Sequence, residues 1–151
     1  MESITVRTAG PKDMGRVLEL IKELAEYENE PDAVLNTEEQ LVEDGFGTNK
    51  VFDCFVAVYN DIIVGFALFY TGYSTWNGKT LYLEDFIVEE ASRGLGAGRA
   101  LFDAVVQEAK KRKVRRMDWQ VLEWNELAIE FYKKNDALLD AEWLNGRLFF
   151  K

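Results

Sequence analysis

The chain has 151 residues, of which 48% are hydrophobic and 30% charged, so we expect one domain with a single packed core over residues 1–151. Its 27 acidic side chains outnumber 18 basic ones, and the formal net charge of −9 argues against a nucleic-acid partner and favours a small cationic one. Histidine is absent, which excludes histidine-dependent triads and histidine-ligated zinc, and no metal site is expected. Acid–base chemistry must therefore use carboxylates, tyrosine, lysine, cysteine or water.

The sequence also indicates where the protein resides. No apolar run approaches the ~20 residues that a membrane span needs, so we expect no membrane association. The first residues lack the basic and apolar regions of a secretory signal, and a single cysteine, Cys54, cannot form an internal disulfide. We therefore expect a cytoplasmic protein with Cys54 in its core.

The first third of the chain predicts one strand and two helices. Residues 4–7 alternate as a short strand, and apolar side chains recur at helical spacing over residues 14–25, with Pro11 near the helix start. Residues 37–40, Thr-Glu-Glu-Gln, have the form of a capping box, in which threonine and glutamine satisfy free N–H groups at a helix start. A second, short helix is expected from there to about Gly45.

The middle of the chain predicts an antiparallel meander. Residues 51–59 and 62–70 are rich in β-branched and aromatic side chains, and Asn60-Asp61 between them is typical of a hairpin turn. Residues 79–88 are expected to form the third strand of this meander.

The last part of the chain predicts a crossover. A glycine-rich loop at residues 94–98 opens into a helix with an apolar face. A strand over residues 116–122, a helix from about 125 to 134 and a final strand over residues 147–150 follow. Antiparallel strands followed by a strand–loop–helix–strand unit indicate a mixed α+β fold.

The glycine-rich loop, Arg-Gly-Leu-Gly-Ala-Gly over residues 93–98, is typical of anion binding. It does not match a P-loop, because Arg99 stands where that motif needs lysine. It matches the dinucleotide fingerprint poorly, because Arg99 or Leu101 stands where the third glycine belongs. Glycines still let the backbone approach an anion, and the N–H groups of a helix start point towards it. The simpler alternative is a tight turn without a ligand.

Two motifs resemble those of the GNAT acetyltransferases. The loop is similar to the family's Q/R-x-x-G-x-G/A sequence, and residues 125–132, Asn-Glu-Leu-Ala-Ile-Glu-Phe-Tyr, match its N-x-x-A-x-x-x-Y helix. Four further segments resemble the spermidine/spermine and thialysine acetyltransferase subgroup. They are LIKELAEYE (20–28), LVEDGFG (41–47), LYLEDF (81–86) and EWNE (123–126).

The resemblance implies a GNAT fold, with a central mixed, mostly antiparallel sheet and helices on both faces. It also implies acetyl-CoA as co-substrate, held by the strand before the loop, the loop itself and the start of the later helix. The implied contacts are Phe86, Ile87, Val88, Arg93, Gly94, Leu95, Gly96, Ala97, Gly98, Arg99, Asn125, Glu126, Leu127, Ala128 and Tyr132.

Acetyl transfer to an amine requires proton transfers. A primary amine with a pKa of about 10.4 is mostly protonated at neutral pH, and only its neutral form attacks a thioester. The resemblance implies Glu84 as the proton acceptor, acting through water, and Tyr132 as the donor to the departing sulfur. The residues alone would favour a solvated strand carboxylate for Glu84 and a half-buried packing residue for Tyr132, and it is the resemblance that favours the catalytic roles. A backbone N–H of residues 86–88 is a candidate to polarise the thioester carbonyl.

The resemblance also implies substrate contacts, namely Tyr27, Glu28, Trp76, Glu84 and Asp85. Strict strand alternation puts Glu84 and Asp85 on opposite faces of the sheet, whereas the bulge found in this family would bring both towards the cleft. The family often has glycine near the end of the later helix, where this chain has Asn135-Asp136, and we expect a left-handed turn there.

One departure bears on the substrate. The polyamine branch carries an acid two residues before a tryptophan, where this chain has Ser74-Thr75-Trp76. One fewer acid suits a shorter amine with a carboxylate, so we expect Nε-acetylation of thialysine. The alternatives are a diamine or polyamine acetyltransferase and, in another class, a non-catalytic CoA-binding module. The resemblance further implies a homodimer whose last strand is either missing in part or exchanged with the partner.

Overall fold

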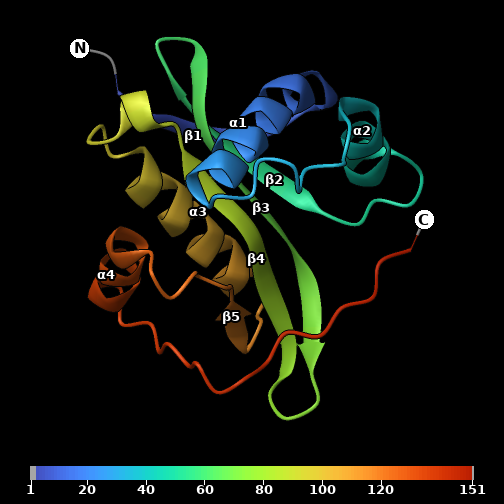
Figure 1. The fold of residues 1–151 in the computed structure, drawn as a ribbon, viewed down its shortest axis with the longest axis vertical. Coiled ribbons are helices and arrows are strands. Elements are labelled where there is room, and N and C mark those ends of the chain that lie inside the picture. Colours follow the sequence, from blue (N-terminus) through green and yellow to red (C-terminus); the bar gives the residue numbers. More distant parts are fainter. Residues whose placement is uncertain (1–2, 151) are drawn as a thin grey trace. The chain divides into compact units, whose positions relative to one another are not determined.

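The computed structural model describes residues 3–150 (Figure 1). The ends of the predicted domain, residues 1–2 and 151, lie outside the described part. The chain forms two compact units, residues 1–119 and residues 120–151. The described elements of the first unit are β1 (Thr5–Thr8), η1 (Pro11–Asp13), α1 (Met14–Tyr27), α2 (Glu38–Phe46), β2 (Asp53–Tyr59), β3 (Ile62–Ser74), β4 (Gly78–Val88), η2 (Glu90–Ser92), α3 (Ala97–Lys111) and β5 (Arg116–Asp118). The second unit contains α4 (Glu126–Lys134).

The first unit is built on a sheet with strand order β1-β2-β3-β4-β5. The first three pairings are antiparallel, and β4 pairs with β5 in parallel. The parallel pair is joined by α3, as a crossover requires. The predicted mixed, mostly antiparallel sheet is therefore confirmed.

Helices cover both faces of this sheet, also as predicted. One face packs against α1 and α2 through a core that includes Met14, Val17, Leu20, Phe66 and Leu68. The other packs against α3 through a core that includes Phe69, Leu81, Leu83, Leu101 and Val105. Cys54 is 3% exposed and belongs to the first of these cores, which confirms its predicted place.

Local sequence signals fix several boundaries. The Thr37 hydroxyl accepts a hydrogen bond from the Gln40 backbone N–H at 3.1 Å, which caps α2 at its predicted start. Asn60 and Asp61 adopt φ values of 51° and 62°, the left-handed conformation of a two-residue hairpin. In the second unit, Asp136 has a φ of 62°, so the left-handed turn expected after the later helix is present.

Two strand predictions need correction. β5 ends at Asp118, short of the predicted residue 122, because its ladder with β4 stops beside an irregularity in β4 that is described below. No strand forms over residues 147–150 within the described chain, so that prediction is wrong. Leu148, Phe149 and Phe150 are 83–91% exposed, and a strand without a neighbour leaves its backbone groups unpaired.

Candidate active site

The strand that carries the two adjacent acids is irregular at that point. In the ladder between β3 and β4, Leu68 pairs with Asp85. The next residue, Phe69, pairs with Leu83, so Glu84 is an extra residue in β4. An extra residue of this kind is a β-bulge, which shifts the alternation of side chains by one position and bends the strand. The bulge also explains why the ladder with β5 ends here.

The bulge places both carboxyl groups on the face of the sheet that α1 covers. Asp85 pairs with Leu68, whose side chain belongs to the core under α1. Tyr70, two residues further along β3, lies on the same face and donates a hydrogen bond from its hydroxyl to Glu84 at 3.2 Å. Strict alternation therefore fails here, and the bulge that the family resemblance implies is present.

A third carboxyl group contributes to this site. Burial, the neighbouring Glu84 and Glu28 at the end of α1 together raise the pKa of Asp85 to about 6. Burial also raises the pKa of Glu28. Three acids lie on one side of the sheet, and among the described residues none of them has an ion pair. They make a site that attracts a positively charged ligand.

Two tyrosines beside the acids were missed by the sequence analysis. Tyr70 and Tyr82 pair across β3 and β4, with ring centroids 5.4 Å apart. Burial, the charge of Glu84 and the hydrogen bond to it raise the pKa of Tyr70 to about 12, so its hydroxyl keeps the proton that it donates. The sequence held no signal for Tyr70, because only the strand register brings it opposite the bulge.

The end of α1 approaches the glycine-rich loop. The guanidinium carbon of Arg93 lies 5.4 Å from the centroid of the Tyr27 ring, which is a cation–π contact. The structure thus brings predicted substrate residues, Tyr27 and Glu28, near both the loop and Asp85.

The glycine-rich loop has an open backbone. Gly94 and Gly96 have φ values of 88° and 87°, and a Cβ added at either residue would meet no atom within 4 Å. Gly96 is the residue before α3, so the N–H groups of the first turn of that helix follow directly. Arg93, Leu95 and Arg99 are exposed, whereas Ala97 is buried. The loop has the shape and charge of a cradle for a phosphate group.

The strand before the loop offers a backbone edge. Within the described chain the ladder between β4 and β5 covers only residues 80–82 of β4, although β4 continues to Val88. Phe86 and Val88 pack towards α3, and Ile87 packs towards α1. The edge of residues 86–88 that would face β5 therefore lies beyond the parallel ladder, where an extended ligand can add to the sheet.

The second unit holds the later helix and its two motif residues. The side-chain oxygen of Asn125 accepts a hydrogen bond from the Ala128 N–H at 3.3 Å, so Asn125 caps the start of α4. Tyr132 is 7% exposed, and burial raises its pKa to about 12. Glu126 and Leu127 are exposed in the first turn of α4.

Trp76 stands apart from the other candidate residues. It is 90% exposed in the turn between β3 and β4, where its N–H donates to the Ser74 hydroxyl at 3.2 Å. Glu84 lies six positions after Gly78, where β4 begins, which is about 20 Å along an extended chain. Trp76 is therefore not brought to the acids within this chain.

The comparison with protein families identifies the family of the chain. A sequence model of the acetyltransferase (GNAT) family matches residues 17–136. The chain belongs to this family. GNAT proteins are acyltransferases, so the predicted family, fold and enzyme class are confirmed.

Individual relatives agree with this assignment. The thialysine N-epsilon-acetyltransferase of Sus scrofa is 39% identical over 152 residues, which cover 94% of this chain and 89% of that protein. The human spermidine/spermine N(1)-acetyltransferase-like protein 1 is 40% identical over 91% of this chain, but the chain spans only 21% of its length. The crystal structure of a possible acetyltransferase from Clostridium difficile 630 shares the fold, with a TM-score of 0.80 and 18% identity, covering 99% of this chain and 100% of that one.

Among the described residues, no helix is both long and apolar enough to cross a membrane.

Proposed function

We propose that this GNAT protein transfers the acetyl group of acetyl-CoA to the amine of a small molecule, with thialysine as the preferred substrate and Nε as the acetylated atom. The observation that carries the proposal is the bulge in β4, which turns Glu84 and Asp85 to one face beside Glu28. Such a group of acids attracts a cationic amine and can take a proton from it. The proposed acetyltransferase domain spans residues 1–151, and the family match crosses the boundary between the two units.

The chain has residues that fit acetyl-CoA, which the family generally uses. The open backbone at Gly94 and Gly96, the Arg93 guanidinium and the start of α3 would hold its pyrophosphate. Residues 86–88 would pair with its extended arm along the edge of β4. Residues 125–128 at the start of α4 are also proposed as contacts. When bound, acetyl-CoA supplies an activated acetyl group as a thioester.

The proposed proton transfers use residues with suitable properties. Glu84 lies exposed at the bulge and would accept the amine proton through a water molecule. Tyr132, with its pKa raised to about 12 by burial, is fully protonated near neutral pH and would donate to the departing sulfur. Asp85, Glu28 and Tyr27 would hold the cationic substrate, and Trp76 would contribute only if the substrate or a second subunit reaches it.

The choice of thialysine over polyamines depends on two observations. A thialysine acetyltransferase is similar to this chain over 89% of its own length, and Ser74 stands where the polyamine branch has an acid. A diamine or polyamine acetyltransferase stays the alternative, since the human spermidine/spermine-type relative is 40% identical. A non-catalytic CoA-binding module is the alternative of another class. We further propose that the protein acts in the cytoplasm as a homodimer.

The proposal is tested by measuring CoA release from acetyl-CoA with thialysine, lysine, spermidine and putrescine. We expect the highest kcat/KM with thialysine. A preference for spermidine would exclude the proposed substrate and favour the polyamine alternative. Tight binding of acetyl-CoA without turnover of any amine would instead favour the binding module.

The donor role of Tyr132 is tested by Tyr132→Phe. We expect kcat to fall about 10²-fold, within the usual range for loss of a general acid, while the Kd for acetyl-CoA changes little. An unchanged kcat would remove Tyr132 from this role.

A further inference from the structure

The tip of the glycine-rich loop has little of its own to hold it in shape. A Cβ at Gly94 or Gly96 would meet no atom within 4 Å, and Arg93 and Leu95 are exposed. Two glycines with positive φ also have many backbone conformations available in the absence of contacts. The conformation of the loop must therefore be set by the segments at its two ends, which are η2 and α3.

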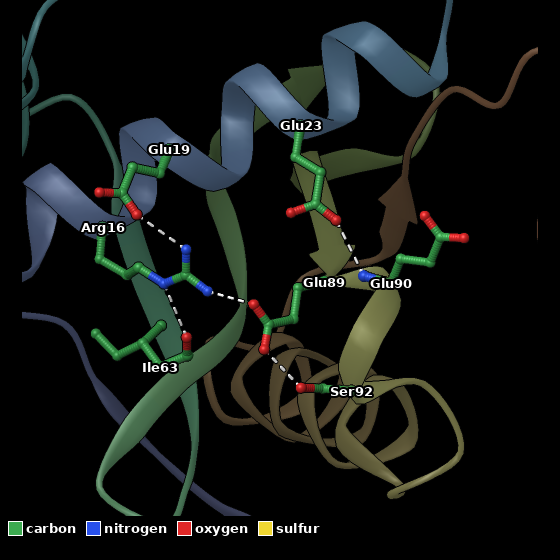
Figure 2. A network of polar contacts seen from close by, with 7 residues as sticks. All are labelled: Arg16, Glu19, Glu23, Ile63, Glu89, Glu90 and Ser92. Carbon is green, nitrogen blue, oxygen red and sulfur yellow. Dashed lines mark hydrogen bonds and ion pairs between the residues drawn. The ribbon is translucent and has the colours of Figure 1, made fainter.

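A network of polar contacts holds the segment that leads into the loop (Figure 2). One oxygen of the Glu89 carboxylate forms an ion pair with Arg16 of α1, and the other accepts a hydrogen bond from the Ser92 hydroxyl at 2.6 Å. The Glu89 backbone N–H donates to the Val64 carbonyl of β3 at 2.8 Å. Glu89 therefore joins α1 and β3 to the last residue of η2, which directly precedes Arg93.

Arg16 is itself fixed on three sides. Its Nε donates to the Ile63 carbonyl at 3.0 Å, and its Nη1 contacts the Glu19 carboxylate at 3.0 Å, while Nη2 reaches Glu89 (Figure 2). A guanidinium can serve three acceptors in one plane, which an ammonium group cannot. The Ile63 carbonyl of β3 thus orients the Arg16 guanidinium, and the guanidinium in turn orients the Glu89 carboxylate.

The same face of α1 makes two further contacts with this segment. The Glu23 carboxylate accepts a hydrogen bond from the Glu90 N–H at 3.0 Å, and the Tyr27 ring lies against Arg93. Residues 16, 23 and 27 are separated by seven and four positions, so they share one helical face. That face runs beside the chain from residue 89 to residue 93. It therefore connects the loop to the end of α1, where Glu28 lies.

We propose that Arg16, acting through Glu89 and Ser92, is a positioning residue for acetyl-CoA binding. It holds η2 so that the backbone of residues 93–98 keeps the shape that accepts the pyrophosphate. It also neutralises Glu89, whose carboxylate would otherwise repel an anion bound a few residues away. The inference rests on the proposed use of this loop for acetyl-CoA.

The test is the variant Arg16→Met, which keeps a long side chain but removes the three donors. We expect the KM and the Kd for acetyl-CoA to rise about tenfold, the effect of losing one charge-assisted interaction, while kcat and the KM for the amine stay within about twofold. Arg16→Lys should recover part of the affinity, because lysine can pair with Glu89 but cannot also reach the Ile63 carbonyl.

The matched control is Arg112→Met. Arg112 pairs with Asp53 and Glu108, and its side chain is 24% exposed against 29% for Arg16. It lies over the Phe69 ring on the α3 side of the sheet, away from Glu84 and the loop. We expect both methionine variants to lower the Tm, but only Arg16→Met to weaken acetyl-CoA binding. Equal effects of the two variants on the Kd for acetyl-CoA would overturn the inference.

A milder variant keeps the inference testable should Arg16→Met fail to fold. Ser92→Ala removes one hydroxyl and leaves the ion pair, and we expect it to raise the Kd for acetyl-CoA about threefold to tenfold with a small change in Tm. An unchanged Kd in a folded Ser92→Ala protein would overturn the inference. Calorimetry on the wild-type chain distinguishes failure of this inference from failure of the proposed function. If the wild-type chain does not bind acetyl-CoA, the proposed function and this inference are both overturned.

Discussion

At the scale of single residues, Asp85 shows that the candidate site is held at a cost in stability. Its pKa is raised from 3.8 to about 6, with burial as the largest cause. A carboxyl whose pKa is raised on folding favours the protonated form in the folded state, so the folded protein loses stability as the pH rises from about 4 to above 6. A protein optimised for stability alone would not place a half-buried acid there.

The variant Asp85→Asn tests this cost. It should raise the free energy of unfolding at pH 7.5 by about 2–3 kcal/mol, the equivalent of two pKa units, and change it much less at pH 3.5, where Asp85 is mostly protonated in both states. Urea unfolding at the two pH values measures the difference. The same stabilisation at both pH values would mean that the charge of Asp85 is not its cause. Because the variant also removes a substrate-side charge, we expect a higher KM for cationic amines.

Tyr70 is another residue of the site whose role can be tested, and this role depends on a single contact. Its hydroxyl donates to Glu84 at 3.2 Å, and this bond holds the carboxylate in one orientation at the bulge. Tyr70→Phe should lower kcat about threefold to tenfold, the effect of one hydrogen bond of about 1 kcal/mol, while the Kd for acetyl-CoA changes little. Steady-state kinetics and calorimetry measure these two quantities. An unchanged kcat would show that Tyr70 does not orient Glu84.

At the scale of elements, the sequence located the strands and helices better than their irregularities. Leu81 and Leu83 face α3 before the bulge, and Phe86 and Val88 face it afterwards. Leu83 and Phe86 face the same side although they are three positions apart, which shows that the alternation of side chains shifts between them. The apolar Ile87 on the other face makes this shift hard to recognise in the sequence. Periodicity therefore predicted β4 but not the side of the sheet on which Asp85 lies, and only the strand register reveals that Glu84 is the extra residue.

The glycine-rich loop allows a paired test at the same scale. Gly96 has a φ of 87° before α3, whereas Gly98 lies inside α3, where an added Cβ would meet only ordinary contacts at 3.8 Å. Gly96→Ala should lower the free energy of unfolding by about 1–2 kcal/mol, because alanine avoids the left-handed conformation. Gly98→Ala should raise it by about 0.5–1 kcal/mol through helix propensity. Chemical denaturation of both variants checks the opposite signs, and equal signs would contradict this account of the loop.

At the scale of the whole molecule, the prediction of a last strand failed because a strand cannot be specified by its own residues alone. Residues 147–150 have the apolar, aromatic composition of a strand, but they form no strand within the described chain. The sequence of a segment shows whether it can form a strand, but strand pairing also requires the edge of a neighbouring strand. The exposed Leu148, Phe149 and Phe150 therefore fit the proposed homodimer, in which a partner would supply that edge.

The double variant Phe149→Glu with Phe150→Glu tests the exchange of this segment. Two charges on residues that are 87% and 91% exposed should not unfold the subunit, but they should prevent these side chains from entering an apolar interface. We expect the wild-type chain to sediment as a dimer and the double variant as a monomer in analytical ultracentrifugation. Leu35→Glu is the matched control, since Leu35 is also 87% exposed but lies in the first unit, between α1 and α2. A double variant that stays dimeric would show that the segment is not exchanged, because two carboxylates cannot be buried in the partner without losing most of the association free energy.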